Sequence, residues 1–159
     1  MNKHVIIKLL TIIVIITLFL SGCSKNNDLL ELKKNIEKQD PNVIDINKLM
    51  NLIGSINYID ETLLNGKEIE EPQVINKYNV PEKVSQIAKV KLFEPELKLE
   101  FYKMDYLKLK LEYLKGNMTK IEYNKQLSDL KKRYKEDRTK IINQINEYIT
   151  DAYKNSLNK

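Results

Sequence analysis

Apolar residues recur at three- and four-residue spacing along most of the chain, which predicts helices almost throughout. A first short helix is expected to end near Gln39, because Pro41 disfavours helical geometry at Asp40. A longer helix is expected over 44–64. Its apolar face comprises Ile46, Leu49, Met50, Ile53, Ile56, Ile59 and Leu63. Gly66 closes this helix, since glycine adopts the left-handed conformation after a helix end without steric cost.

Residues 67–80 follow a less regular pattern and are expected to form a connecting loop with at most one helical turn. Pro81 suits the first turn of the next helix. The apolar residues of that helix are Val84, Ile87, Ala88 and Leu92, and Pro95 is expected to interrupt it before another begins.

The two longest helical segments, about 95–115 and 119–155, are expected to form an antiparallel hairpin that turns at 116–118. Gly116 can turn the chain, and Thr119 and Glu122 have the spacing of a capping box. The long arm would measure roughly 55 Å against about 30 Å for the short one, so the helix over 44–64 should cover the remainder, or the long arm should bend near Asp137. The predicted fold is all-α, an irregular helical bundle with a long C-terminal antiparallel helical hairpin over about 95–157.

The segment 95–115 carries two apolar stripes about half a turn apart. One stripe contains Leu97, Phe101, Met104, Leu107, Leu111 and Leu114, and the other contains Leu99, Tyr102, Tyr106, Leu109 and Tyr113. Because tyrosine buries a large ring and keeps a wettable hydroxyl, Tyr102, Tyr106 and Tyr113 are candidate partner-binding residues. The competing and favoured interpretation is that the helix is sandwiched between two others and buries both stripes.

The N-terminus has the pattern of a secretory signal peptide. Lys3 and Lys8 precede twelve uncharged residues, 9–20, which are too few to span a bilayer core of roughly 30 Å. The tetrapeptide Leu20-Ser21-Gly22-Cys23 resembles the lipobox of bacterial lipoproteins. This resemblance covers only the first 23 residues and concerns sorting, not activity.

The lipobox resemblance implies cleavage between Gly22 and Cys23 and lipidation of the Cys23 sulfur, so that acyl chains hold the protein on the extracytoplasmic face of the cell membrane. The division expected is then a signal peptide over 1–22, a lipidated cysteine with a short polar tether over 23–27, and one all-α domain over 28–159. The alternative is an uncleaved N-terminal membrane anchor over 5–20. The basic residues are almost all lysines, which is typical of AT-rich genomes and favours a Gram-positive source.

The composition narrows the chemistry of the mature chain. Its one histidine, His4, lies in the signal segment, and its one cysteine is the lipidation residue. Nucleophilic catalysis with histidine, Cys/His zinc sites and internal disulfides are therefore excluded. We predict no catalytic residues, no metal site and no cofactor. A net charge of +5 in an exported chain is weak evidence for nucleic acid, and no nucleic-acid partner is expected.

Three charged clusters have both a functional and a structural interpretation. The run 131–140 could hold anionic headgroups, but it is better explained as a solvated helix face with a Lys132–Glu136 pair. The acidic residues Glu68, Glu70 and Glu71 could bind a hard cation, but a solvated loop is favoured. Glu94, Glu96 and Glu100 could form a carboxylate pair, although acids near a helix start complement its dipole anyway.

Two functional hypotheses follow from the sequence. The first is a non-enzymatic lipoprotein whose helical domain binds an envelope protein or scaffolds a complex. The alternative is a small-ligand-binding or enzymatic lipoprotein that uses Asp, Glu, Lys and Tyr side chains in an interhelical cleft.

Overall fold

The computed structural model describes residues 25–157, which form an all-α bundle. Its elements are α2 (Lys25–Ile36), α3 (Ile46–Ile59), the π-helical turn η1 (Asp60–Leu64), α4 (Glu82–Lys91), α5 (Phe93–Leu114) and α6 (Lys120–Leu157). No strand occurs within 25–157. None of the helices in this range is both long and apolar enough to cross a membrane.

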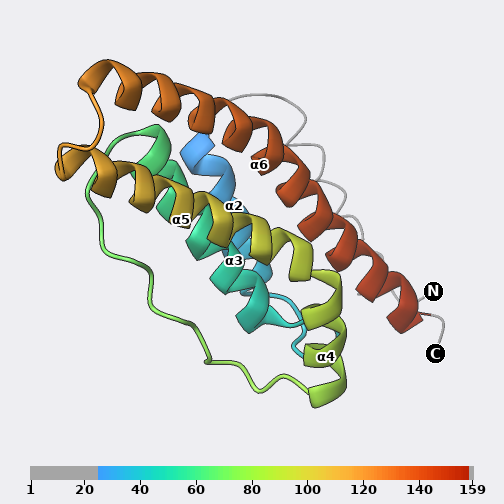
Figure 1. The fold of residues 1–159 in the computed structure, drawn as a ribbon. Helices are drawn as coiled ribbons and strands as arrows, with labels where there is room; N and C mark the ends of the chain where they lie inside the picture. The colour runs from blue at the N-terminus through green and yellow to red at the C-terminus, as the bar shows by residue number, and fades with distance from the viewer. Residues whose placement is uncertain (1–24, 158–159) are drawn as a thin grey trace.

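Helix α3 lies at the centre of the bundle, in contact with α2, α4 and α5 (Figure 1). The whole apolar face expected for 44–64 is buried, and Leu52 on a neighbouring face is buried as well. A helix that is apolar on more than one side must be covered on more than one side, which explains the central position. The side chain of Asp45 caps the start of α3 by accepting a hydrogen bond from the Lys48 amide at 2.9 Å.

The predicted C-terminal hairpin is confirmed: α5 and α6 pack antiparallel along one side of the molecule (Figure 1). The capping box is present, since the Glu122 amide donates to Thr119 Oγ1 at 3.2 Å and the Thr119 amide donates to Glu122 Oε2 at 2.9 Å. Gly116 has a φ of 77°, the left-handed conformation that the turn requires. At the hairpin tip the rings of Tyr113 and Tyr123 stack with centroids 4.5 Å apart.

The middle of α6 is neither broken nor exposed, contrary to one expectation. The helix is continuous over 38 residues, and Tyr134 at its centre is fully buried against α3 and η1. The segment 44–64 thus meets α6 at its middle, through Ile56 and Asp60, whereas the far end of the long arm docks onto the link between α2 and α3. The sequence pattern was misleading here because Arg138 counts as a polar residue but points into the bundle.

The C-terminal third of α6 docks onto the link between α2 and α3 through two tyrosine hydroxyls. The Asp45 amide donates to Tyr148 Oη at 3.1 Å, and the Asp40 amide donates to Tyr153 Oη at 3.3 Å. Both tyrosines are about 5% exposed. Burial raises the pKa of each hydroxyl above its ordinary value, so the protonated form is favoured in the folded state.

Three element boundaries differ from those predicted. Residues 25–27, expected in a polar tether, already belong to α2, where Asp28 in the first turn complements the helix dipole. The second helix ends in the π-helical turn η1, not in α-helix. The break between α4 and α5 falls at Leu92, three residues before Pro95, which fits inside the first turn of α5 because amides there have no intrahelical acceptor.

Candidate functional site

Helix α5 has one buried and one exposed apolar face, so the prediction that both stripes are covered is wrong. The tyrosine stripe is the inner one. Tyr102 is 8% exposed, its hydroxyl donates to Asp137 Oδ2 at 2.8 Å, and its ring meets the edge of Tyr134 with centroids 5.2 Å apart. Tyr106 and Tyr113 are half-buried. The three candidate tyrosines therefore line the inside of the bundle and the hairpin instead of a free surface.

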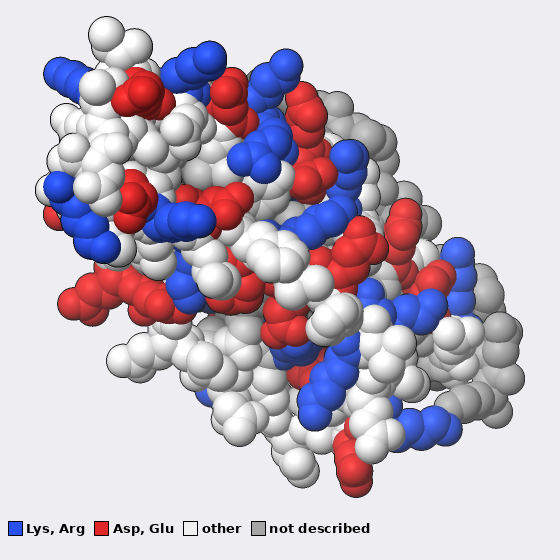
Figure 2. All heavy atoms as spheres, in the orientation of Figure 1, with Lys and Arg blue, Asp and Glu red and all other residues white. Residues whose placement is uncertain are grey.

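The opposite stripe of α5 is exposed over the full length of the helix. Its members are Phe93, Leu97, Phe101, Met104, Leu107, Leu111 and Leu114, between 39% and 70% exposed, and we call this set the α5 face. In the face of the molecule drawn in Figure 2, uncharged side chains stand between acidic and basic ones along the diagonal that α5 follows. Single exposed apolar residues are common, but a contiguous row of seven is typical of an interaction surface.

Charged side chains border the α5 face on both sides. Glu94 pairs with Lys98 at 2.8 Å, and this pairing lowers the pKa of the carboxyl and raises that of the amine. Lys103 pairs with Glu71, and Lys110 with Glu68 at 2.7 Å. The pKa of each of these lysines is raised chiefly by the hydrogen bond to its carboxylate. Two residues of the acidic loop cluster, Glu68 and Glu71, thus bridge the loop to α5.

Two asparagines of α3 hold the loop 67–81 as a strap beside α5. The Asn51 amide group accepts from the Ile75 backbone N–H at 2.7 Å and donates to the Ile75 carbonyl at 3.1 Å. Asn47 donates to the Tyr78 carbonyl at 2.8 Å and accepts from the Lys77 and Tyr78 amides at 3.0 and 3.1 Å. These bonds satisfy backbone groups that an irregular segment would leave to water.

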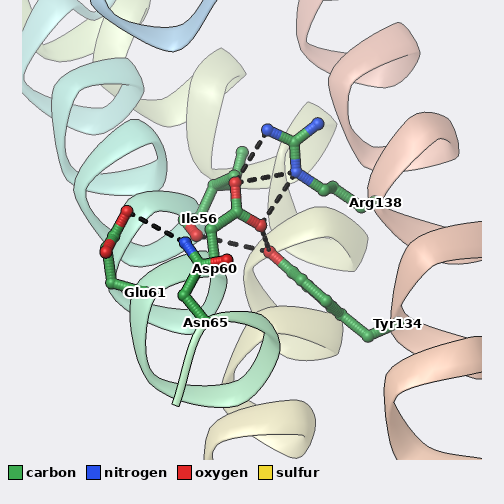
Figure 3. A network of polar contacts seen from close by, with 6 residues as sticks. All are labelled: Ile56, Asp60, Glu61, Asn65, Tyr134 and Arg138. Atoms are coloured by element: carbon green, nitrogen blue, oxygen red, sulfur yellow. Dashed lines mark hydrogen bonds and ion pairs between the residues drawn. The ribbon is translucent and has the colours of Figure 1, made fainter. Parts of the chain in front are cut away.

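A buried polar network joins η1 to α6 (Figure 3). The Arg138 guanidinium binds both carboxylate oxygens of Asp60. Its Nε lies 2.9 Å from each oxygen, and one terminal nitrogen lies 2.8 Å from Oδ2. The Tyr134 hydroxyl donates to Asp60 Oδ1 at 2.9 Å, and burial, reinforced by the Asp60 charge, raises its pKa. Asp60 is only 4% exposed and Tyr134 is fully buried.

The Asp60 network is a structural clamp. Both acceptor oxygens of Asp60 are engaged and solvent does not reach the phenol, so a substrate has no access to these groups. The clamp was not predicted from the sequence, because Arg138 and Asp60 are 78 positions apart and each looked like an ordinary surface charge. A cue was present, however: Asp60 lies on the same helix face as Ile56 and Ile59.

A cleft of 430 Å³ lies between α5 and α6. Under the alternative hypothesis, a small ligand or substrate would bind in this cleft. Buried Leu109 and Leu130 form its floor. Its charged lining residues are Asp105, Lys108, Glu112, Asp129 and Arg133, all exposed or half-exposed. The cleft is therefore lined by charges of both signs that solvent reaches.

The remaining charged candidates also find structural roles. Glu96 pairs with Lys48 of α3 and Glu100 with Lys103 at 3.6 Å, so each carboxylate is held by a lysine. In the run 131–140 only some residues are solvated: Lys131 donates to the Leu64 carbonyl at 3.1 Å and caps the end of η1. Within 25–157 no group of three acidic residues could hold a metal ion.

The predicted signal cleavage between Gly22 and Cys23 and the predicted lipidation of Cys23 lie outside the described residues. No protein family matches the chain, and neither the curated proteins nor the solved structures include one similar to it.

Proposed function

We propose that the protein is a lipid-anchored docking protein of the cell envelope, held to the outer face of the cell membrane through Cys23, and that its α5 face binds another protein. The observation that carries the docking part is the row of seven exposed apolar side chains on α5. The anchoring part is supported by the lipobox-like residues 20–23, which directly follow a short apolar segment.

The rest of the described chain supports binding over catalysis. Buried Asp60 belongs to the clamp, buried Asp45 caps α3, and the cleft between α5 and α6 holds solvated charges of both signs. The α5 face, in contrast, is flanked by charged residues, as in protein interfaces with an apolar centre and a polar rim.

Docking is tested by placing a photo-crosslinking amino acid at position 104 in intact cells. Met104 is 62% exposed at the middle of the α5 face, so the replacement leaves the fold intact. The matched control is position 136, where Glu136 is exposed on α6 away from this face. We expect a discrete protein adduct from position 104 and none from position 136. Absence of an adduct at position 104 above the control would refute docking.

Anchoring is tested separately by Cys23→Ala. We expect the variant to lose lipid labelling, to keep its uncleaved N-terminus and to change its extraction from membranes by mild detergent. A Cys23→Ala chain of processed wild-type length that still fractionates fully with the membrane would show that lipid at Cys23 is not the anchor.

A further inference from the structure

We propose that the α5 face binds the α5 face of a second copy of this chain, with the two helices antiparallel. This inference rests on the proposed docking role of the same face and names its partner. Three properties of the described helix carry it: the spacing of its apolar residues, the order of its flanking charges, and its area.

The apolar residues have the spacing of a helix–helix seam. Leu97, Met104 and Leu111 are seven residues apart, and Phe93, Leu107 and Leu114 occupy the complementary positions of the same heptad. Glu100 is the one polar residue in the seam, and it is already paired with Lys103. Two helices bury such a seam by inserting each side chain between those of the other helix. The α5 face thus has the pattern that a second helix requires.

The flanking charges favour the antiparallel orientation. In the first half of α5 the flanking positions carry Glu94 and Glu96, and in the second half they carry Lys108 and Lys110. Antiparallel pairing brings each acidic half against the basic half of the second copy, with Glu94 near Lys108 and Glu96 near Lys110. Charges at these positions set the choice and orientation of coiled-coil partners.

Parallel pairing would be opposed by the same charges. It would place Lys103 near Lys108 and Lys110 near Lys115 of the second copy, and like charges across an interface are unfavourable. In the antiparallel arrangement the only like pair is Lys103 with its own counterpart. Each Lys103 already lies between Glu71 and Glu100 of its own chain. Glu94, Glu96 and Lys110 also have ion pairs within the chain, so the charges across the seam add little energy and act on the orientation.

The exposed area is of the size of an ordinary specific interface. Seven side chains that are about half exposed offer on the order of 600 Å² of apolar surface. The stems of the flanking lysines would bring the buried area to about 800 Å² per copy, the size of an ordinary specific interface. A membrane surface fits less well, because Glu94, Glu96 and Glu100 would be driven against anionic headgroups.

The orientation can be measured by thiol crosslinking of the full chain in its own membranes. Cells carry two differently tagged copies, one with Phe93→Cys and one with Leu111→Cys. In the antiparallel seam, position 93 of one copy faces position 111 of the other, whereas identical positions are about 27 Å apart along the axis. With a thiol reagent that spans about one helix diameter, roughly 10 Å, we expect a mixed 93–111 dimer and at least tenfold less of either same-site dimer.

Two further variants complete the experiment. Met104→Glu, in the seam, should abolish the mixed dimer, and Ile121→Glu, at an apolar residue that is 82% exposed but outside the seam, should leave it unchanged. Wild-type chain, whose only thiol is that of Cys23, controls for crosslinking elsewhere.

Each outcome decides the proposal. Same-site dimers in place of the mixed one would overturn the antiparallel orientation. If position 104 captures only a different protein and no self-dimer forms, self-pairing is overturned while the docking role stands. If position 104 captures nothing, both proposals fail together.

Discussion

Replacing Arg138 by leucine should destabilise the protein strongly, because Asp60 would keep a buried charge without its counter-ion. The Asp60 carboxylate is 4% exposed and lies 2.8 Å from the guanidinium. At an effective dielectric constant of about 20, two unit charges at this distance attract by about 6 kcal/mol, which offsets a desolvation cost of several kcal/mol per ion. Removing one partner leaves that cost uncompensated and typically destabilises by about 3–5 kcal/mol.

Equilibrium urea unfolding, followed by far-ultraviolet circular dichroism, measures this loss. In thermal unfolding the same loss corresponds to a decrease in Tm on the order of 10–20 °C for a domain of this size. The double variant Asp60→Leu with Arg138→Leu should be more stable than Arg138→Leu alone. The clamp then holds no charge, and the Tyr134 hydroxyl keeps the Ile56 carbonyl, 3.3 Å away, as acceptor.

The matched control is Lys140→Leu, which breaks an ion pair with Asp137 in which the lysine is 66% exposed. This change should cost less than about 1 kcal/mol, as exposed pairs do. If Arg138→Leu is as mild as the control, or if the double variant is no more stable than the single one, the clamp is solvated and the reasoning is refuted.

Three further predictions concern the turn, the strap and the tyrosines. Gly116→Ala should lower the free energy of unfolding by about 1–2 kcal/mol and Gly116→Asn by less, because the φ of 77° strains residues with a Cβ. Urea unfolding measures both losses, and equal losses would contradict this cause. Asn51→Ala should increase proteolytic cleavage within 67–81 with little change in global stability, because only the two hydrogen bonds to Ile75 are lost. Asn57→Ala, at an exposed position of α3, is the control. Stability should fall as pH rises above about 10, because unfolded tyrosines ionise there while burial raises the pKa of Tyr102 and Tyr134 in the folded state. Tyrosinate absorbance measured with circular dichroism checks this, and ionisation of all tyrosines before any loss of helix would contradict it.

The sequence was informative where local rules decide the structure. The Thr119–Glu122 capping box, the left-handed conformation of Gly66 and the turn at Gly116 depend on residues close in the chain, and each is present as predicted. The buried face of α3 was also predicted, since a period of 3.6 residues identifies the apolar side of a helix without knowledge of its neighbours.

The sequence did not predict which of the two apolar stripes of α5 packs against α6. Both stripes of α5 have helical spacing, and nothing local says which of them α6 covers. The choice depends on Asp137 and Tyr134 of α6, which receive the hydroxyl and the ring of Tyr102. A phenol can bury its ring and still bond a carboxylate at the rim, whereas Leu and Phe offer no polar group for that position. The tyrosine stripe therefore packs against α6, and the purely apolar stripe is exposed.

An exposed apolar helix face is a liability for a freely diffusing protein, because it favours non-specific association. On the proposed anchoring, two acyl chains would confine every copy to one membrane, and confinement raises the effective concentration of the other copies. An interface of about 800 Å² per copy, small for a permanent dimer, could then form at the membrane while remaining weak elsewhere. The lipid would thus allow α5 to keep an apolar face of modest area, and the opposed charges of its two halves would select a second copy in one orientation.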